Sequence, residues 1–177
     1  MIEYSGKILI TGATGFVGGR LLHNLTAQGI KVRCLVRSPD KLRKEFSQSE
    51  EVDVVAGDLL KPETYENGLE GIKVAYYLVH SMGGRTVGEN KVFVQRDRDA
   101  AENFMRAADR AGVARIIYLG GLGETGENLS KHLASRQEVG EIYLRVVLKR
   151  PNSGHPTLWV LAGHRLRCFV IWWSGYR

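Results

Sequence analysis

Short apolar runs of strand length alternate with segments of helical period along the first two-thirds of the chain. Continuous apolar runs are typical of parallel strands that helices cover on both faces. Regular alternation of such strands with helices predicts an α/β fold. The predicted strands are Lys7–Thr11, Lys31–Val36, Val52–Ala56, Val74–Val79 and Ala114–Leu119.

Amphipathic segments fill the intervals between these strands. The predicted helices are Phe16–Gln28, Asp40–Phe46, Thr64–Leu69, Val92–Ala111 and Leu133–Ile142. Gly29 and Gly112 are the expected stops of the first and fourth helices. The apolar face of the first helix is expected to consist of Phe16, Val17, Leu21, Leu22 and Leu25. Right-handed crossovers would order the five strands 3-2-1-4-5, which is a doubly wound parallel sheet of the Rossmann fold.

A glycine-rich turn joins the first predicted strand to the first predicted helix. Its glycines have GxxGxxG spacing in a strand-turn-helix context, which is typical of dinucleotide binding. They would form the tight turn, let backbone N–H groups approach a pyrophosphate and let the helix pack on the strand. The phosphates would then lie at the positive end of the helix dipole. The predicted cofactor contacts here are Gly12, Thr14, Gly15, Phe16, Val17 and Gly18; a purely structural glycine turn is the alternative.

The end of the second strand indicates which cofactor is bound. An acidic residue there would accept hydrogen bonds from the ribose of NAD, but no carboxylate occurs before Asp40. Arg37 stands in its place, with Arg33 and Lys41 nearby, and a guanidinium binds a 2′-phosphate well. We therefore favour NADP(H) over NAD(H), and the alternative is that Arg37 is a solvated surface charge.

Two residues after the third strand complete the predicted adenosine side of the site. Asp58, followed by Leu59, is placed to accept a hydrogen bond from the adenine amino group. A helix N-terminal cap is the alternative role for this aspartate.

The motifs TGATGFVGGRL, VRCLVR, GDLL, YYLVHSMGG and IIYLGGLG follow one another over about residues 5–142. With them the chain resembles the atypical and extended short-chain dehydrogenase/reductase superfamily, close to its NmrA-like and epimerase/dehydratase-like NAD(P)-binding members. The resemblance implies that His80, Ser81 and Met82 lie beside the cofactor's ribose and nicotinamide. It also implies that Gly120 to Gly123 line the site at the end of the fifth strand.

The catalytic residues are where the chain departs from this superfamily's pattern. Its enzymes use a Tyr-x-x-x-Lys pair on the helix after the fifth strand and a hydroxyl at that strand's end. Here the strand ends without a hydroxyl, and the segment HLASRQEVGE follows. Its His132 and Arg136 have the spacing of the pair and would share a helix face, where a histidine could transfer a proton. They are the catalytic candidates, with Ser81 and Ser135 as fallback hydroxyls, or they are a plain surface pair.

Two functions fit this pattern. The first is an NAD(P)H-dependent oxidoreductase or nucleoside-sugar epimerase-like enzyme, in its intact form, acting on a small molecule that the sequence does not identify. The second is a non-catalytic NAD(P)-binding redox sensor or assembly factor, because the catalytic pair is missing.

Length and composition limit the number of domains, the expected location and the kinds of site. The 177 residues suffice for one domain, and no apolar run approaches the twenty residues of a membrane span. The N-terminal sequence lacks the pattern of a secretory signal, so a cytoplasmic location is expected. Cys34 and Cys168 lie far apart with no CxxC spacing or histidine cluster, so no metal site is expected, and Cys34 is predicted to be a core residue.

The excess of positive charge lies in the last part of the chain. Residues 1–140 hold 19 Lys+Arg against 18 Asp+Glu, a net charge of +1, and residues 141–177 hold 6 against 1, a net charge of +5. Because no binding motif accompanies this charge, we do not expect a nucleic-acid partner.

The same region departs from the superfamily in its hydrophobic pattern. If the reading frame is shifted one nucleotide earlier from about Arg145, codons compatible with this amino-acid sequence can encode other residues. The segments that they encode resemble the family's sixth strand and its next amphipathic helix. We therefore infer that the NAD(P)-binding domain spans residues 1–142. Residues 143–177 form an atypical basic tail that is not a domain and comes from a frameshift in the gene or in its sequencing. The sheet is then expected to be incomplete, with the fifth strand as an exposed edge.

Overall fold

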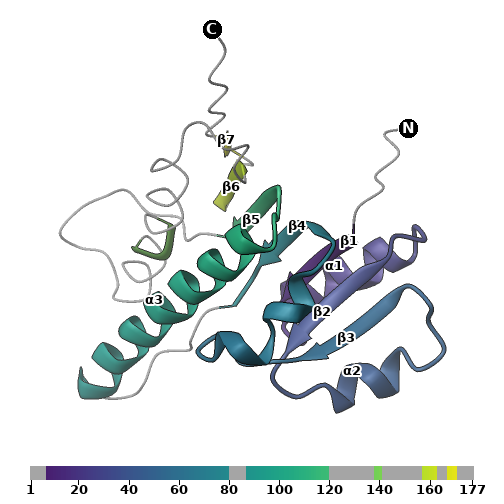
Figure 1. Ribbon diagram of the computed structural model, residues 1–177, viewed down its shortest axis with the longest axis horizontal. Coiled ribbons are helices and arrows are strands. Elements are labelled where there is room, and N and C mark those ends of the chain that lie inside the picture. The colour runs from purple at the N-terminus through teal and green to yellow at the C-terminus, as the bar shows by residue number, and fades with distance from the viewer. Residues whose placement is uncertain (1–6, 80–86, 120–137, 141–156, 163–166, 171–177) are drawn as a thin grey trace, which may run out of the picture.

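A single sheet organises the part of the chain that the structure describes. The structure is a computed structural model that describes residues 7–79, 87–119, 138–140, 157–162 and 167–170, with only the backbone described for residues 87–93, 157–162 and 167–170. The strands lie in the order β3-β2-β1-β4-β5-β6-β7 (Figure 1). Their bounds are Lys7–Thr11 for β1, Val32–Val36 for β2, Val52–Ala56 for β3, Ile72–Tyr77 for β4, Arg115–Leu119 for β5, Thr157–Ala162 for β6 and Arg167–Val170 for β7.

The first five strands are parallel to one another and confirm the predicted order 3-2-1-4-5. Strand β1 lies in the middle of this set, paired with β2 on one side and β4 on the other. The order reverses at β1 and β4, because one half of the fold continues to β3 and the other to β5. Ligands of doubly wound sheets bind at this reversal, outside the carboxyl ends of the strands.

The expectation that β5 is an exposed edge is wrong. Strand β6 pairs with β5 in parallel over its length, and β7 pairs antiparallel with β6. The segment TLWVLA of β6 is a continuous apolar run that includes β-branched and aromatic residues, which favour strands. The absence of alternation in this run is compatible with a strand inside a sheet, because alternation marks a strand with one solvated face.

The helices follow the predicted order with small shifts at their ends. Their bounds are Phe16–Thr26 for α1, Asp40–Glu45 for α2 and Val87–Arg110 for α3, with the 3-10 turns η1 at Pro62–Thr64 and η2 at Glu66–Leu69. These turns replace the helix predicted over 64–69. Gly29 and Gly112 follow α1 and α3 with φ of 71° and 70°, as predicted for the two stops. Of the helix predicted over 133–142, residues 138–140 are helical and the others lie outside the described residues. No helix among the described residues is long and apolar enough to span a membrane.

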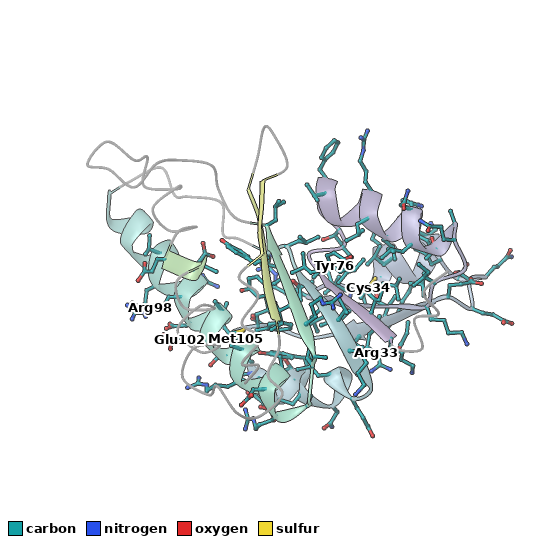
Figure 2. The ribbon with its side chains drawn as sticks, turned by 90° about the horizontal axis from the view of Figure 1, so that it is seen from above. Arg33, Cys34, Tyr76, Arg98, Glu102 and Met105 are labelled. Carbon is teal, nitrogen blue, oxygen red and sulfur yellow. The ribbon has the colours of Figure 1, made fainter. Side chains whose placement is uncertain are left out.

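Two hydrophobic layers lie on opposite faces of the sheet, with α3 on one side and α1 on the other (Figure 2). Successive residues of β1 alternate between them, since Leu9 packs in the layer of α3 whereas Ile8 and Ile10 pack in the layer of α1 and α2. Cys34 is fully buried in the second layer, which confirms the prediction that it is a core residue. Burial, with a smaller contribution from Asp53, raises the pKa of its thiol to about 12.

Candidate cofactor-binding site

The chain turns sharply at Gly12, directly after β1. Gly12 has a φ of +75°, and a Cβ at this position would lie 3.0 Å from the carbonyl oxygen of Leu78. Its own carbonyl oxygen accepts a hydrogen bond from the N–H of Gly15 at 3.0 Å. Glycine is required here by both the backbone angle and the approach of the Leu78 backbone directly after β4. The turn is therefore built in the way that the GxxGxxG spacing predicts.

Gly18 brings the first turn of α1 onto the glycine turn. A Cβ at Gly18 would overlap the carbonyl oxygen of Gly12 and lie 2.8 Å from its carbonyl carbon. Gly15 is the N-cap of α1, and having no side chain it does not cap the first N–H groups of the helix. These N–H groups form the positive end of the helix dipole. The start of α1 therefore presents a place for an anionic group such as a pyrophosphate.

Phe16 and Val17 are exposed at the start of α1, at 76 % and 47 % of their surface. The expectation that they belong to the buried face of the helix is wrong, because that face consists of Gly18, Leu22 and Leu25. The guanidinium of Arg20 lies over the Phe16 ring, 4.6 Å from its centroid. The exposure of two large apolar side chains next to the glycine turn is compatible with their predicted contact with a cofactor.

Thr11 joins the ends of the two central strands and was not singled out from the sequence. This residue is fully buried, and its hydroxyl donates a hydrogen bond to the carbonyl of Tyr76 and accepts one from the N–H of Leu78, both at 3.2 Å. The signal in the sequence is a hydroxyl residue that ends an apolar strand directly before the first glycine. The hydroxyl fixes the β4 end against the glycine turn, at the reversal of the strand order.

Arg37 and Arg33 have different surroundings at β2. Arg37 follows the last residue of β2 and is exposed, and in the described part of the chain it has no ion pair. Arg33 instead lies within β2 and donates to Asp53 at 2.6 Å and to the carbonyls of Gly68 and Glu70. The guanidinium of Arg33 is therefore already held by partners on β3 and at η2 and the residue after it, whereas that of Arg37 is exposed.

Asp58 and Leu59 follow the carboxyl end of β3. One carboxylate oxygen of Asp58 accepts a hydrogen bond from the N–H of Leu60 at 3.0 Å, while the Asp58 N–H donates to the Thr64 hydroxyl. Asp58 thus stabilises a turn, and the helical N-cap after it is Lys61. The side chain of Leu59 is buried in the core layer of α3, so any contact between Leu59 and a cofactor would come from its backbone.

The described candidates come together at one edge of the sheet. The glycine turn, Arg37 and Asp58 follow the carboxyl ends of β1, β2 and β3, which are neighbours in the sheet. The other candidates lie outside the described residues, namely His80, Ser81, Met82, 120–123, His132, Ser135 and Arg136. Among the residues that the structure describes, no group of three or more His, Cys, Asp or Glu could hold a metal ion.

A parallel sheet with a glycine turn at its order reversal, followed by the uncapped start of a helix, defines the class of dinucleotide-binding α/β domains. The chain belongs to the NAD(P)H-binding family, whose model matches residues 12–149. The match ends a few residues after the predicted domain boundary at residue 142.

Relatives of known name agree with this class. The chain is 36 % identical over 133 residues to a ceramide reductase of Caulobacter vibrioides, covering 75 % of this chain and 40 % of the relative. It is 30 % identical over 113 residues to the photosystem II assembly factor Ycf39 of a Synechocystis strain, covering 63 % of this chain and 32 % of the relative. The chain therefore spans less than half the length of the relatives that it matches.

A solved structure supports the fold. The yeast methylglyoxal/isovaleraldehyde reductase Gre2, complexed with NADPH, superimposes with a TM-score of 0.75 at 11 % identity, covering 87 % of this chain and 56 % of that one. At this identity the likeness concerns the fold alone. The NAD(P)-binding class and the doubly wound fold that the sequence motifs predict are thus confirmed by the family match and by the arrangement of the strands.

Proposed function

We propose that this chain is the cofactor-binding part of an NADP(H)-dependent oxidoreductase or epimerase-like enzyme. The observation that carries the proposal is the glycine turn at the order reversal of the sheet, with the uncapped start of α1 beside it. The ceramide reductase relative supports an oxidoreductase. The substrate stays unassigned.

The residues at the turn fit a nicotinamide dinucleotide. When bound, such a cofactor supplies or accepts a hydride at its nicotinamide ring. The backbone N–H groups at the start of α1 would hold the pyrophosphate, and the exposed Phe16 and Val17 would cover one side of it. Thr11 would keep the β4 end at a fixed place beside the turn. A group near His80 or His132 stays the predicted candidate for proton transfer, with Arg136 at the spacing of the catalytic pair.

The preference for the phosphorylated cofactor rests on the end of β2. Arg37 is exposed at this position, and Lys41 on α2 lines a cavity that Thr14 and Gly15 of the glycine turn also line. Two cations close to the glycine turn would attract a 2′-phosphate, whereas NAD would find no carboxylate for its ribose. These residues support NADP(H) over NAD(H).

Replacing Gly15 with aspartate tests whether the turn binds the cofactor. Gly15→Asp is expected to raise the dissociation constant of NADPH about 100-fold, about 2.7 kcal/mol, because a carboxylate would repel the pyrophosphate. The measurement is the quench and blue shift of NADPH fluorescence on titration. Gln48→Asp, at an exposed position between α2 and β3, adds the same charge elsewhere and should leave binding unchanged. Unchanged binding by Gly15→Asp would contradict the proposed function.

Replacing Arg37 with alanine tests the 2′-phosphate assignment. Arg37→Ala is expected to weaken NADPH about ten-fold and NADH less than about two-fold, because only NADPH loses a charge-assisted hydrogen bond. The two dissociation constants come from parallel fluorescence titrations. Arg43→Ala is the control, since Arg43 is an exposed arginine of α2 that donates to the carbonyl of Val54. Equal weakening of both dinucleotides by Arg37→Ala is the result that rules the assignment out.

A second candidate function is a non-catalytic NAD(P)-binding assembly factor or redox sensor. The observations that favour it are the missing Tyr-x-x-x-Lys pair and the relative that is an assembly factor. Both candidate functions need the cofactor. Oxidation of NADPH in the presence of small carbonyl compounds separates them, because only the enzyme turns the cofactor over.

The origin of the last part of the chain stays a proposal of its own. We infer that residues from about 143 onward come from a shifted reading frame, which the DNA of the locus decides. Stop codons in the alternative frame would exclude it.

A further inference from the structure

A small cavity lies between the glycine turn and the first two helices. Its volume is about 170 Å³, and it is lined near the turn by Thr14, Gly15 and Lys41. The buried Leu22 of α1 and Leu42 of α2 also line it. The cavity is thus lined by both apolar and polar residues, with the side chain of Lys41 among them, and it adjoins the glycine turn of the predicted phosphate site.

The lining of this cavity includes a contact between α1 and the end of α2. The Nε2 atom of His23 lies 3.1 Å from Oε1 of Glu45, and the His23 ring packs against Phe46 with 5.2 Å between the ring centroids. All three residues line the cavity. His23 is the residue of α1 that holds the end of α2 in place.

The pairing of Glu45 with His23 leaves Lys41 available. Lys41 and Glu45 stand four residues apart on α2, which is the spacing at which a lysine and a glutamate pair on a helix. Glu45 is paired instead with His23, and within the described part of the chain Lys41 makes no ion pair. The Lys41 ammonium, which lines the same cavity as Thr14 and Gly15 of the glycine turn, is therefore not neutralised by Glu45 of its own helix.

We propose that His23 is a positioning residue for cofactor selectivity, which holds Glu45 away from Lys41 so that Lys41 binds the 2′-phosphate of NADP(H). The inference rests on the proposed function and extends it to a residue of α1. A carboxylate released from His23 would pair with Lys41 and would also repel the phosphate. NADPH binding would suffer from both effects, whereas NADH has no phosphate at this place.

The test compares NADPH and NADH binding to His23 variants of the full chain by fluorescence titration. His23→Leu is expected to raise the dissociation constant of NADPH about five-fold and to leave that of NADH within about two-fold. His23→Gln keeps a donor for Glu45 and should retain the ratio of the two constants. Adding Glu45→Gln to His23→Leu removes the carboxylate and should restore NADPH binding, a rescue that a merely structural role of His23 would not give.

Asn24→Ala is the matched control, because Asn24 is also an exposed residue of α1 that accepts a hydrogen bond from a neighbouring side chain, that of Gln28. It should change neither dissociation constant. Two results would overturn this inference and leave the proposed function standing. One is that His23→Leu does not change the ratio of the NADPH and NADH dissociation constants, and the other is that adding Glu45→Gln does not restore that ratio. Failure of the unaltered chain to bind either dinucleotide overturns both.

Discussion

Gly18→Ala is expected to abolish tight NADPH binding and to lower the free energy of unfolding by about 3 kcal/mol. The added Cβ would lie 2.8 Å from the carbonyl carbon of Gly12 and 3.0 Å from the Cα of Ala13. Both are backbone atoms of the turn, so a side-chain rotation cannot relieve the overlap. The start of α1 would have to move away from the turn, and its N–H groups would leave the place of the pyrophosphate. Urea unfolding and NADPH titration measure the two effects.

The next residue gives a matched control. Gly19 also lies in α1, but a Cβ there would lie 3.4 Å from the carbonyl oxygen of Ala13, an ordinary contact. Gly19→Ala should therefore leave NADPH binding unchanged and stabilise the helix by about 0.5 to 1 kcal/mol. If both alanine variants behave alike, the close packing of α1 on the glycine turn is not what binding requires.

Phe104→Ala is expected to lower the free energy of unfolding by about 3 to 5 kcal/mol. Phe104 is a fully buried residue of α3, and the centroid of its ring lies 5.2 Å from that of Tyr77 and 6.4 Å from that of Tyr65. Its removal leaves a cavity where β4, η2 and α3 meet. Denaturant unfolding followed by circular dichroism measures the loss.

Gln95→Ala on the same helix is the control for this variant. Gln95 is exposed and donates a hydrogen bond to Asp99 on its own helix, so the expected change is below about 0.5 kcal/mol. A loss under about 1 kcal/mol for Phe104→Ala would mean that α3 does not pack on the sheet through this ring.

The framework of the domain could be predicted from the sequence because local patterns determine it. Strands such as β1 are buried on both faces, so they appear as continuous apolar runs, and β1 and β3 have the predicted bounds. Helix ends were predicted less well. Helix α1 ends at Thr26, two residues before the predicted end, because residues 27–29 form a turn whose N–H groups bond back to His23, Leu25 and Thr26.

The parts of the site that depend on distant partners could not be predicted. Arg33 is occupied by Asp53 and by carbonyls of η2, which are 20 to 37 residues away in sequence. Phe16 and Val17 fit the helical period of an apolar face, but the glycine turn rotates that face so that Gly18 rather than Phe16 meets the turn. In both cases the sequence predicts the secondary structure correctly, but contacts with other segments of the chain determine whether the side chain is exposed, buried or paired.

The pairing of β6 with β5 could not be predicted for a different reason. The positive charge and the tryptophan content of the last part of the chain differ from the pattern of the family. For this reason the apolar segment within Thr157–Ala162 does not stand out in the sequence as a strand of the same sheet. Backbone hydrogen bonding depends little on side-chain identity, so an apolar run of strand length suffices to extend a sheet.

The Thr11 hydroxyl connects the two halves of the doubly wound fold. As donor to Tyr76 and acceptor from Leu78, it uses one atom to fix two backbone groups, one in β4 and one directly after it, beside the glycine turn. The chain therefore leaves β4 from a point that is fixed by the strand leading into the glycine turn. A single buried hydroxyl thus ties together the two neighbouring strands at which the strand order of the sheet reverses.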